Sequence, residues 1–87
     1  MIEVFIRNRQ KVLFAGEASA VTAYSEKGVF DILPGHANFI SIIMDKIIIH
    51  GKKREKQQLL IKSGVLKVQE NKVFIFLDLL SPLPFET

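Results

Sequence analysis

The side chains that most often carry out chemistry are few in this sequence. There is no cysteine, and the two histidines, His36 and His50, are far apart with no HxH or HxxxH spacing for a shared metal ion. No serine lies in a Gly-x-Ser-x-Gly nucleophile motif, and neither the GxxxxGK[ST] nor the GxGxxG nucleotide-binding signature occurs. We therefore expect no catalytic residues, no metal and no cofactor, and we expect that the chain is not an enzyme by itself.

A second chemical feature is a basic run, which contains Lys52, Lys53, Arg54 and Lys56. Small β-barrels bind single-stranded nucleic acid by combining such charges with aromatic stacking platforms. The aromatic residues of this chain lie mostly within dense apolar runs, as core residues would. A solvated hairpin tip, in which lysine also prevents edge pairing, is therefore the favoured interpretation. A free-standing β-barrel that binds single-stranded nucleic acid through this run is the alternative.

Length and composition limit the elements that can position these side chains. With 87 residues, of which 48% are hydrophobic, the chain forms one domain over residues 1–87. Ile, Val, Phe, Tyr and Thr total 28 residues against 16 for Ala, Leu and Met, a balance that favours strands. The most apolar stretch, residues 39–49, is interrupted by Ser41, Asp45 and Lys46 and is too short to span a bilayer. The net charge of +3 is a mild bias that would assist docking on an acidic partner.

Turn signals separate short apolar runs along the whole chain. Asn8-Arg9-Gln10, Ser25-Glu26-Lys27-Gly28, Pro34-Gly35, Met44-Asp45, Ser63-Gly64 and Glu70-Asn71-Lys72 are read as turns or breaks, and Gly28 suits a positive φ. The runs between them predict strands at residues 2–7, 12–14, 21–24, 29–33, 39–43, 46–50, 59–61, 65–69 and 73–79. Ser81-Pro82-Leu83-Pro84 then ends the pattern. The fold class is all-β, a flattened β-sandwich or barrel of nine to ten short antiparallel strands.

Some of these runs are apolar on both faces. In residues 47–49 and 74–77 every residue is hydrophobic, whereas residues 2–7 place Ile2, Val4 and Ile6 on one face. A strand that is apolar on both faces needs a cover on each. In a chain of this size, one of the two covers can be another protein.

Three segments resemble one known family in order and spacing. Residues 28–37, GVFDILPGHA, are similar to the G-x-F-G-I-L-P-G-H-A signature of the N-terminal β domain of the ATP synthase epsilon subunit. Residues 12–17, VLFAGE, with Val21-Thr22, resemble its early V-x-F-x-G-E…V-T pattern. Residues 63–73, SGVLKVQENKV, resemble its late S-G-G-F-x-E-V-x-x-N-x-V pattern. The resemblance covers about residues 2–79.

The resemblance implies a noncatalytic central-stalk subunit of an F-type ATP synthase. Such a subunit docks on the gamma subunit and the c-subunit ring and couples ion translocation to ATP synthesis. It is a peripheral protein on the cytoplasmic face of a bacterial membrane, or the equivalent organellar face, and it contacts the membrane only through the complex. By resemblance, Asn8, His36 and Ser41 lie on the gamma side, and Glu26, Lys27, Gly28 and Val29 lie on the c-ring side.

The sequence differs from the family pattern at several positions and in length. Val29, Asp31 and Val65 depart from the family pattern, which affects fine contacts rather than the fold. Many members add a C-terminal helical hairpin, and since the sequence stops at Thr87 we expect a fold that lacks it. His36 follows Pro34-Gly35 and is expected on an ordered, exposed loop. It is either a loop histidine hydrogen-bonded to backbone or a docking residue, and the resemblance favours docking.

Overall fold

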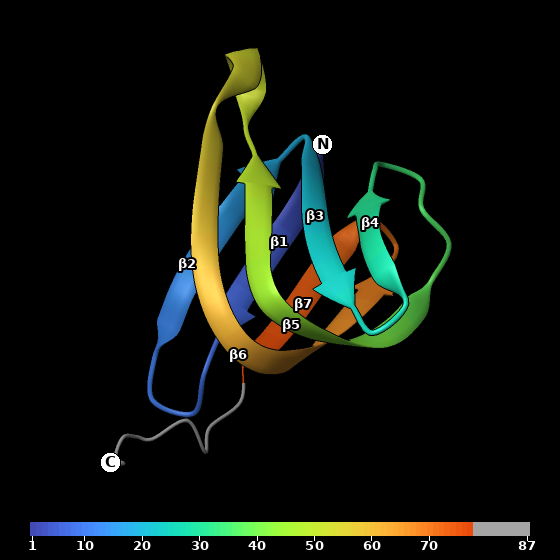
Figure 1. Cartoon of the computed structure of the whole chain (residues 1–87). Helices are drawn as coiled ribbons and strands as arrows, with labels where there is room; N and C mark the ends of the chain where they lie inside the picture. Colours follow the sequence, from blue (N-terminus) through green and yellow to red (C-terminus); the bar gives the residue numbers. More distant parts are fainter. Residues whose placement is uncertain (78–87) are drawn as a thin grey trace.

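The computed structural model describes residues 1–77 as a single curled β-sheet (Figure 1). Its strands are β1 (Ile2–Arg7), β2 (Val12–Ala18), β3 (Ala20–Ser25), β4 (Gly28–Ile32), β5 (Phe39–His50), β6 (Lys56–Gln69) and β7 (Lys72–Leu77). A short 3-10 turn, η1 (Lys52–Arg54), joins β5 to β6, and these 77 residues contain no α-helix. The all-β prediction is confirmed, but the expected nine to ten strands are wrong, because residues 1–77 form seven. Residues 78–87, with the end of the predicted last strand and the Ser81–Pro84 break, lie outside the described residues.

The strand order is β2-β1-β7-β6-β5-β3-β4, and the sheet is mixed. Five of the six neighbouring pairs are antiparallel, but β1 and β7 run parallel, with Val4 opposite Val73 and Ile6 opposite Ile75. The expectation of an entirely antiparallel sheet is therefore corrected. β1 lies between its hairpin partner β2 and β7, and β7 runs in the same direction as β1.

Two long strands explain the lower strand count. Residues 39–43 and 46–50 form the single strand β5, and residues 59–61 and 65–69 form the single strand β6. Met44 pairs with Ser63 and Lys46 pairs with Leu60, so Asp45 alone lies opposite two residues of β6. This is a β-bulge, and Asp45 has a φ of 74°. Because a bulge bends and twists the strands that contain it, β5 and β6 curve into both layers instead of ending at Met44-Asp45 and Ser63-Gly64 (Figure 1).

The core lies between the two layers of the curled sheet. Ile2, Val4 and Ile6 of β1 are at most 1% exposed, which confirms that they share the inward face. Ile43 and Ile47 of β5 are also fully buried, and each central strand contributes buried residues to the same core. Alternate burial along β7, with Val73, Ile75 and Leu77 inside, gives the period of two expected of a strand.

The opposite face of one layer carries a continuous group of exposed apolar side chains. We call it the outer apolar face, and its members are Phe5, Ile40, Ile42, Val65, Phe74 and Phe76. They lie on neighbouring strands: Phe5 is opposite Phe74, and Val65 is opposite both Phe76 and Ile42. The Phe5 and Phe74 rings stack with centroids 5.4 Å apart. Within residues 1–77 nothing covers this face. The apolar pattern of residues 74–77 predicted a cover on each face of this strand, and this part of the chain supplies only one of them.

Candidate functional site

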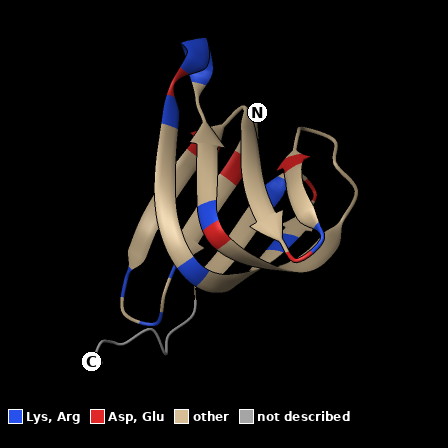
Figure 2. Cartoon of the chain, viewed as in Figure 1, with Lys and Arg blue, Asp and Glu red and all other residues tan. Residues whose placement is uncertain are grey.

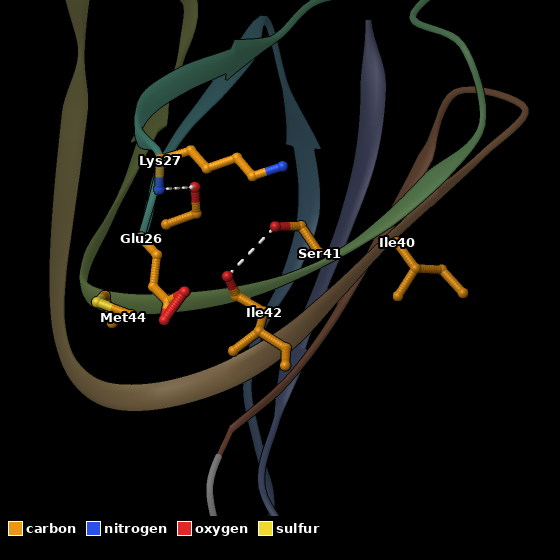
Figure 3. Close-up of a pocket in the computed structure, with 7 residues that line it drawn as sticks. Glu26, Lys27, Ile40, Ser41, Ile42 and Met44 are labelled. Carbon is orange, nitrogen blue, oxygen red and sulfur yellow. Dashed lines mark hydrogen bonds between the residues drawn. The ribbon is translucent and has the colours of Figure 1, made fainter.

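A groove lies between the β3–β4 turn and the first half of β5 (Figure 3). We call it the edge groove; its volume is about 450 Å³, and it is lined by Ser25, Glu26, Lys27, Ile40, Ser41, Ile42 and Met44. The bulge at Asp45 creates the groove, because β5 bends away from β3 there. Ala23 and Ile47 form the last β3–β5 pair on this side, and residues 39–44 pair only with β6.

The β3–β4 turn that forms one wall of the groove is well ordered by local contacts. Ser25 and Gly28 are paired across the hairpin, with Glu26 and Lys27 at its tip. The Ser25 hydroxyl donates to the Gly28 carbonyl at 3.3 Å and accepts from the Lys27 N–H at 3.2 Å. Gly28 has a φ of 120°, as predicted, and Val29 is 59% exposed. The four residues assigned by resemblance to the c-ring side are thus accessible at one end of the molecule.

Ser41, assigned to the gamma side, lies in the edge groove with Glu26 and Lys27 of the ring side. It is half-buried, and its hydroxyl donates to the Ile42 carbonyl at 3.2 Å. The sequence separates these residues by about fifteen positions and gave no sign that they meet. The structure brings them together because β5 passes beneath the β3–β4 turn (Figure 3).

His36 lies on an ordered loop, residues 33–38, that is fixed to the β6–β7 turn by two asparagines. The Gly35 N–H donates to Asn71 Oδ1 at 2.7 Å, and the Glu70 N–H donates to Asn38 Oδ1 at 3.0 Å. His36 itself is half-buried, with its ring 4.9 Å from that of Phe39. Its Nδ1 donates to the Ala37 carbonyl at 2.8 Å, the backbone contact that one of the two interpretations of His36 predicts.

Asn8, the third residue assigned to the gamma side, directly follows the C-terminal end of β1, which is the end far from the His36 loop. Its Oδ1 accepts from the N–H groups of Gln10 and Lys11 at 2.8 and 2.9 Å, so it stabilises the β1–β2 turn. Arg7, which precedes Asn8, is opposite Phe76 near the end of β7. Asn71, which contacts the His36 loop, lies just before Lys72 at the start of β7. The six residue-to-residue steps from Asn71 to Leu77 correspond to about 20 Å of strand. Asn8 and His36 therefore do not form one compact site.

The basic run forms the exposed tip of the long β5–β6 hairpin (Figure 2). Lys52, Lys53, Arg54 and Lys56 are all exposed, and Lys53 and Arg54 have positive φ values of 56° and 70°. The hairpin-tip prediction is confirmed. No aromatic residue occurs in residues 51–56, whereas Phe5, Phe74 and Phe76 lie on the outer apolar face. The tip therefore lacks a stacking platform of its own for bases.

A row of hydrogen-bonded polar side chains across β4, β3 and β5 was not predicted from the sequence. Thr22, which is only 8% exposed, donates from Oγ1 to Asp31 Oδ1 at 2.6 Å. Because the hydroxyl has one proton, Oγ1 accepts from Nε2 of His50 at 2.7 Å. Among residues 1–77 no cluster of three or more His, Cys, Asp or Glu side chains is arranged to hold a metal. The only sequence signal was the polar Thr22 inside an apolar run.

The described part of the chain also contains no helix long and apolar enough to cross a membrane. The exposed features that remain for partner binding are the edge groove, the outer apolar face and the His36 loop.

Comparison with known proteins agrees with the fold. Residues 1–80 match the family described as ATP synthase, Delta/Epsilon chain, beta-sandwich domain. The chain is 31% identical over 71 residues to the ATP synthase epsilon chain of Corynebacterium aurimucosum, covering 79% of this chain and 58% of that one. It is 35% identical over 78 residues to the epsilon chain of Clostridium botulinum, covering 88% of this chain and 59% of that one. The chain thus spans little more than half the length of these relatives.

A solved structure has a closely similar fold. A chain in the mitochondrial ATP synthase of Euglena gracilis superposes with a TM-score of 0.81 at 19% identity, over 87% of this chain and 49% of that one. The fold described above is thus shared with a solved structure. The family match covers residues 1–80 of the 87. The chain belongs to the family of ATP synthase delta/epsilon chain beta-sandwich domains.

Proposed function

We propose that the chain is a noncatalytic central-stalk subunit of an F-type ATP synthase, of the epsilon type, and that it helps to couple ion translocation to ATP synthesis. The observation that carries the proposal is the family match over residues 1–80, the whole of the described sheet. The uncovered outer apolar face supports it, since a subunit of a permanent complex buries such a face against its partners. The membrane contact is indirect, through the complex, on the cytoplasmic or equivalent organellar face.

Two regions would contact two partners. The exposed turn of residues 26–29 would face the c-subunit ring, and Ser41 and the His36 loop would face the gamma subunit. The edge groove supports a junction between the two regions, because Ser41 lines it together with Glu26 and Lys27. Asn8 would contact gamma only if that chain extends along β1, about 20 Å from the His36 loop.

The decisive experiment is co-purification with the cognate gamma subunit, followed by ATP-driven ion pumping in membrane vesicles. The double variant His36→Asp, Ser41→Arg places charges at two assigned contacts, and neither residue belongs to the buried core. We expect it to fold, to lose gamma binding and to uncouple hydrolysis from pumping. The matched control is Lys53→Asp, Arg54→Ser at the hairpin tip, which should leave both unchanged. Gamma binding by the first variant at the wild-type level would count against these contacts.

The alternative, binding of single-stranded nucleic acid at the basic tip, rests on its four exposed cations. Phosphate contacts by these cations would give an affinity that falls steeply with salt. Titration of a labelled single-stranded oligonucleotide at low and moderate salt tests this directly. A flat titration at low salt would dispose of the alternative.

A further inference from the structure

The floor of the edge groove is a free sheet edge. β5 pairs with β6 along both of its halves, whereas β3 pairs only with its second half, where residues 20–23 lie opposite residues 47–50. Beyond that point β3 and its turn diverge from β5. Residues 39–44 therefore have a partner strand on one side only within the described part of the chain.

The alternation of the backbone identifies which groups face this edge. The His50 carbonyl accepts a hydrogen bond from the Ser19 N–H, so the even-numbered residues of β5 direct their backbone groups away from β6. The extra residue of the bulge belongs to β6, so the alternation continues through the first half of β5. Ile40 and Ile42 thus direct their N–H and C=O groups into the groove. There the Ser41 hydroxyl bonds the Ile42 carbonyl, where a neighbouring strand would otherwise donate (Figure 3).

The residues of this edge strand have none of the charges or prolines that usually protect an edge against pairing. Natural edge strands carry charges or proline, or are covered by other elements. Residues 39–44, FISIIM, contain no charge, no proline and no glycine, and Ile40 and Ile42 are each 67% exposed. Both isoleucines belong to the outer apolar face, which continues up to this edge.

We propose that an extended segment of a partner polypeptide adds to residues 39–44 as a further strand, between β5 and the β3–β4 turn. Its outward side chains, beside Ile40 and Ile42, would be apolar and would continue the outer apolar face. Its inward side chains, beside Ser41, would be small or polar. Strand addition supplies affinity through main-chain hydrogen bonds and specificity through alternate side chains.

The shape of the groove favours a single free segment over a second copy of this chain. In a second copy the same edge lies beneath its own β3–β4 turn, so pairing two such edges would bring the two turns against each other. The proposal rests on the proposed function only for the partner's identity, which would be the gamma subunit. The free edge itself does not depend on that assignment.

The test compares Ile42→Pro with Ile42→Val for binding to the purified cognate gamma subunit. Proline removes an N–H that faces the groove rather than β6, so the isolated fold tolerates it, as on other sheet edges. Loss of one main-chain hydrogen bond and insertion of the ring should weaken binding by about tenfold or more. Ile42→Val keeps the N–H and the branched side chain, and its affinity should stay within about twofold of wild type. In the complex, the Ile40 and Ile42 amides should exchange with solvent more slowly than in the free chain.

Each contrary result has a distinct meaning. Equal gamma affinity of the two variants, or unprotected Ile40 and Ile42 amides in the complex, would overturn strand addition while leaving the proposed function intact. A dimer in sedimentation that Ile42→Pro dissociates would replace the partner segment by a second copy. Faster Ile42 exchange after deletion of residues 78–87 would assign the edge to the chain's own end. Failure of the wild-type chain to bind gamma would refute the proposed function and the assigned partner together.

Discussion

Asn71 connects the β6–β7 turn to the His36 loop, and its replacement should measure that connection. It has a φ of 65°, and its Oδ1 accepts the Gly35 N–H at 2.7 Å. Asparagine tolerates the left-handed conformation better than other non-glycine residues. Two separable contributions to stability therefore come from one side chain.

Asn71→Ala removes both contributions, and Asn71→Gly removes only one. The left-handed conformation should cost alanine about 1 kcal/mol relative to asparagine. The lost hydrogen bond to Gly35 should cost about 1 kcal/mol more, since Asn71 is exposed and water replaces part of it. We expect a loss of about 2 kcal/mol for alanine, or about 10 °C in Tm for a domain of this size. Glycine adopts this φ freely and should lose about 1 kcal/mol.

Urea unfolding followed by far-UV circular dichroism gives the free energy of unfolding for the three proteins. Hydrogen exchange at the Gly35 amide reports the side-chain bond separately, and exchange should accelerate equally in both variants. Identical stability of the alanine and glycine variants would refute the backbone argument. An unchanged Gly35 amide in both variants would refute the connection between the turn and the His36 loop.

Four further substitutions test other contacts by the same unfolding measurement. Gly64→Ala should destabilise by about 1–3 kcal/mol, because its Cβ would lie 2.9 Å from the Phe76 carbonyl oxygen. Gly16→Ala, whose Cβ would meet only ordinary contacts, should be neutral or stabilising by up to about 1 kcal/mol, and equal effects at the two sites would contradict the steric reasoning. Thr22→Val should cost about 1–2 kcal/mol by removing both hydrogen bonds of the hydroxyl, and wild-type stability would show that they contribute nothing net. Glu70→Asn should stabilise by about 0.5 kcal/mol, because Glu70 has a φ of 50° in a two-residue hairpin turn; a lower Tm would contradict this.

Local pattern determined much of the fold. The alternation of Ile2, Val4 and Ile6 correctly identified the buried face of β1, and Gly28 correctly marked a turn with positive φ. Met44-Asp45 correctly marked an irregular position, but its consequence was misjudged. The break expected at Ser63-Gly64 is wrong, because Gly64 pairs with Ile43 and Ser63 with Met44, and the irregularity on β6 lies at residues 61–62. A bulge and a chain reversal interrupt the apolar pattern in the same way, and only the pairing of β5 with β6 distinguishes them.

The candidate site was less predictable because it depends on pairing between distant segments. Individual residues such as Glu26, Lys27 and Ser41 were assigned through family resemblance, and the structure shows only where they lie. Their meeting in the edge groove follows from the bend at Asp45, which has no signature in a single sequence. The exposed Ile40 and Ile42 were missed for a similar reason, since a continuous apolar run does not reveal which side chains lack a cover.

The parallel pairing of β1 with β7 has a consequence for synthesis of the chain on the ribosome. Residues 3–7 emerge well before their partners, residues 72–76. The β1–β2 hairpin can form early, but one edge of β1 stays open until residues 72–76 have been translated. Closure of the sheet between β1 and β7 is thus a late step in the formation of this sheet. A polypeptide truncated before residue 72 would retain an apolar strand with an unpaired edge, which is a substrate for chaperones and proteases rather than a smaller stable domain.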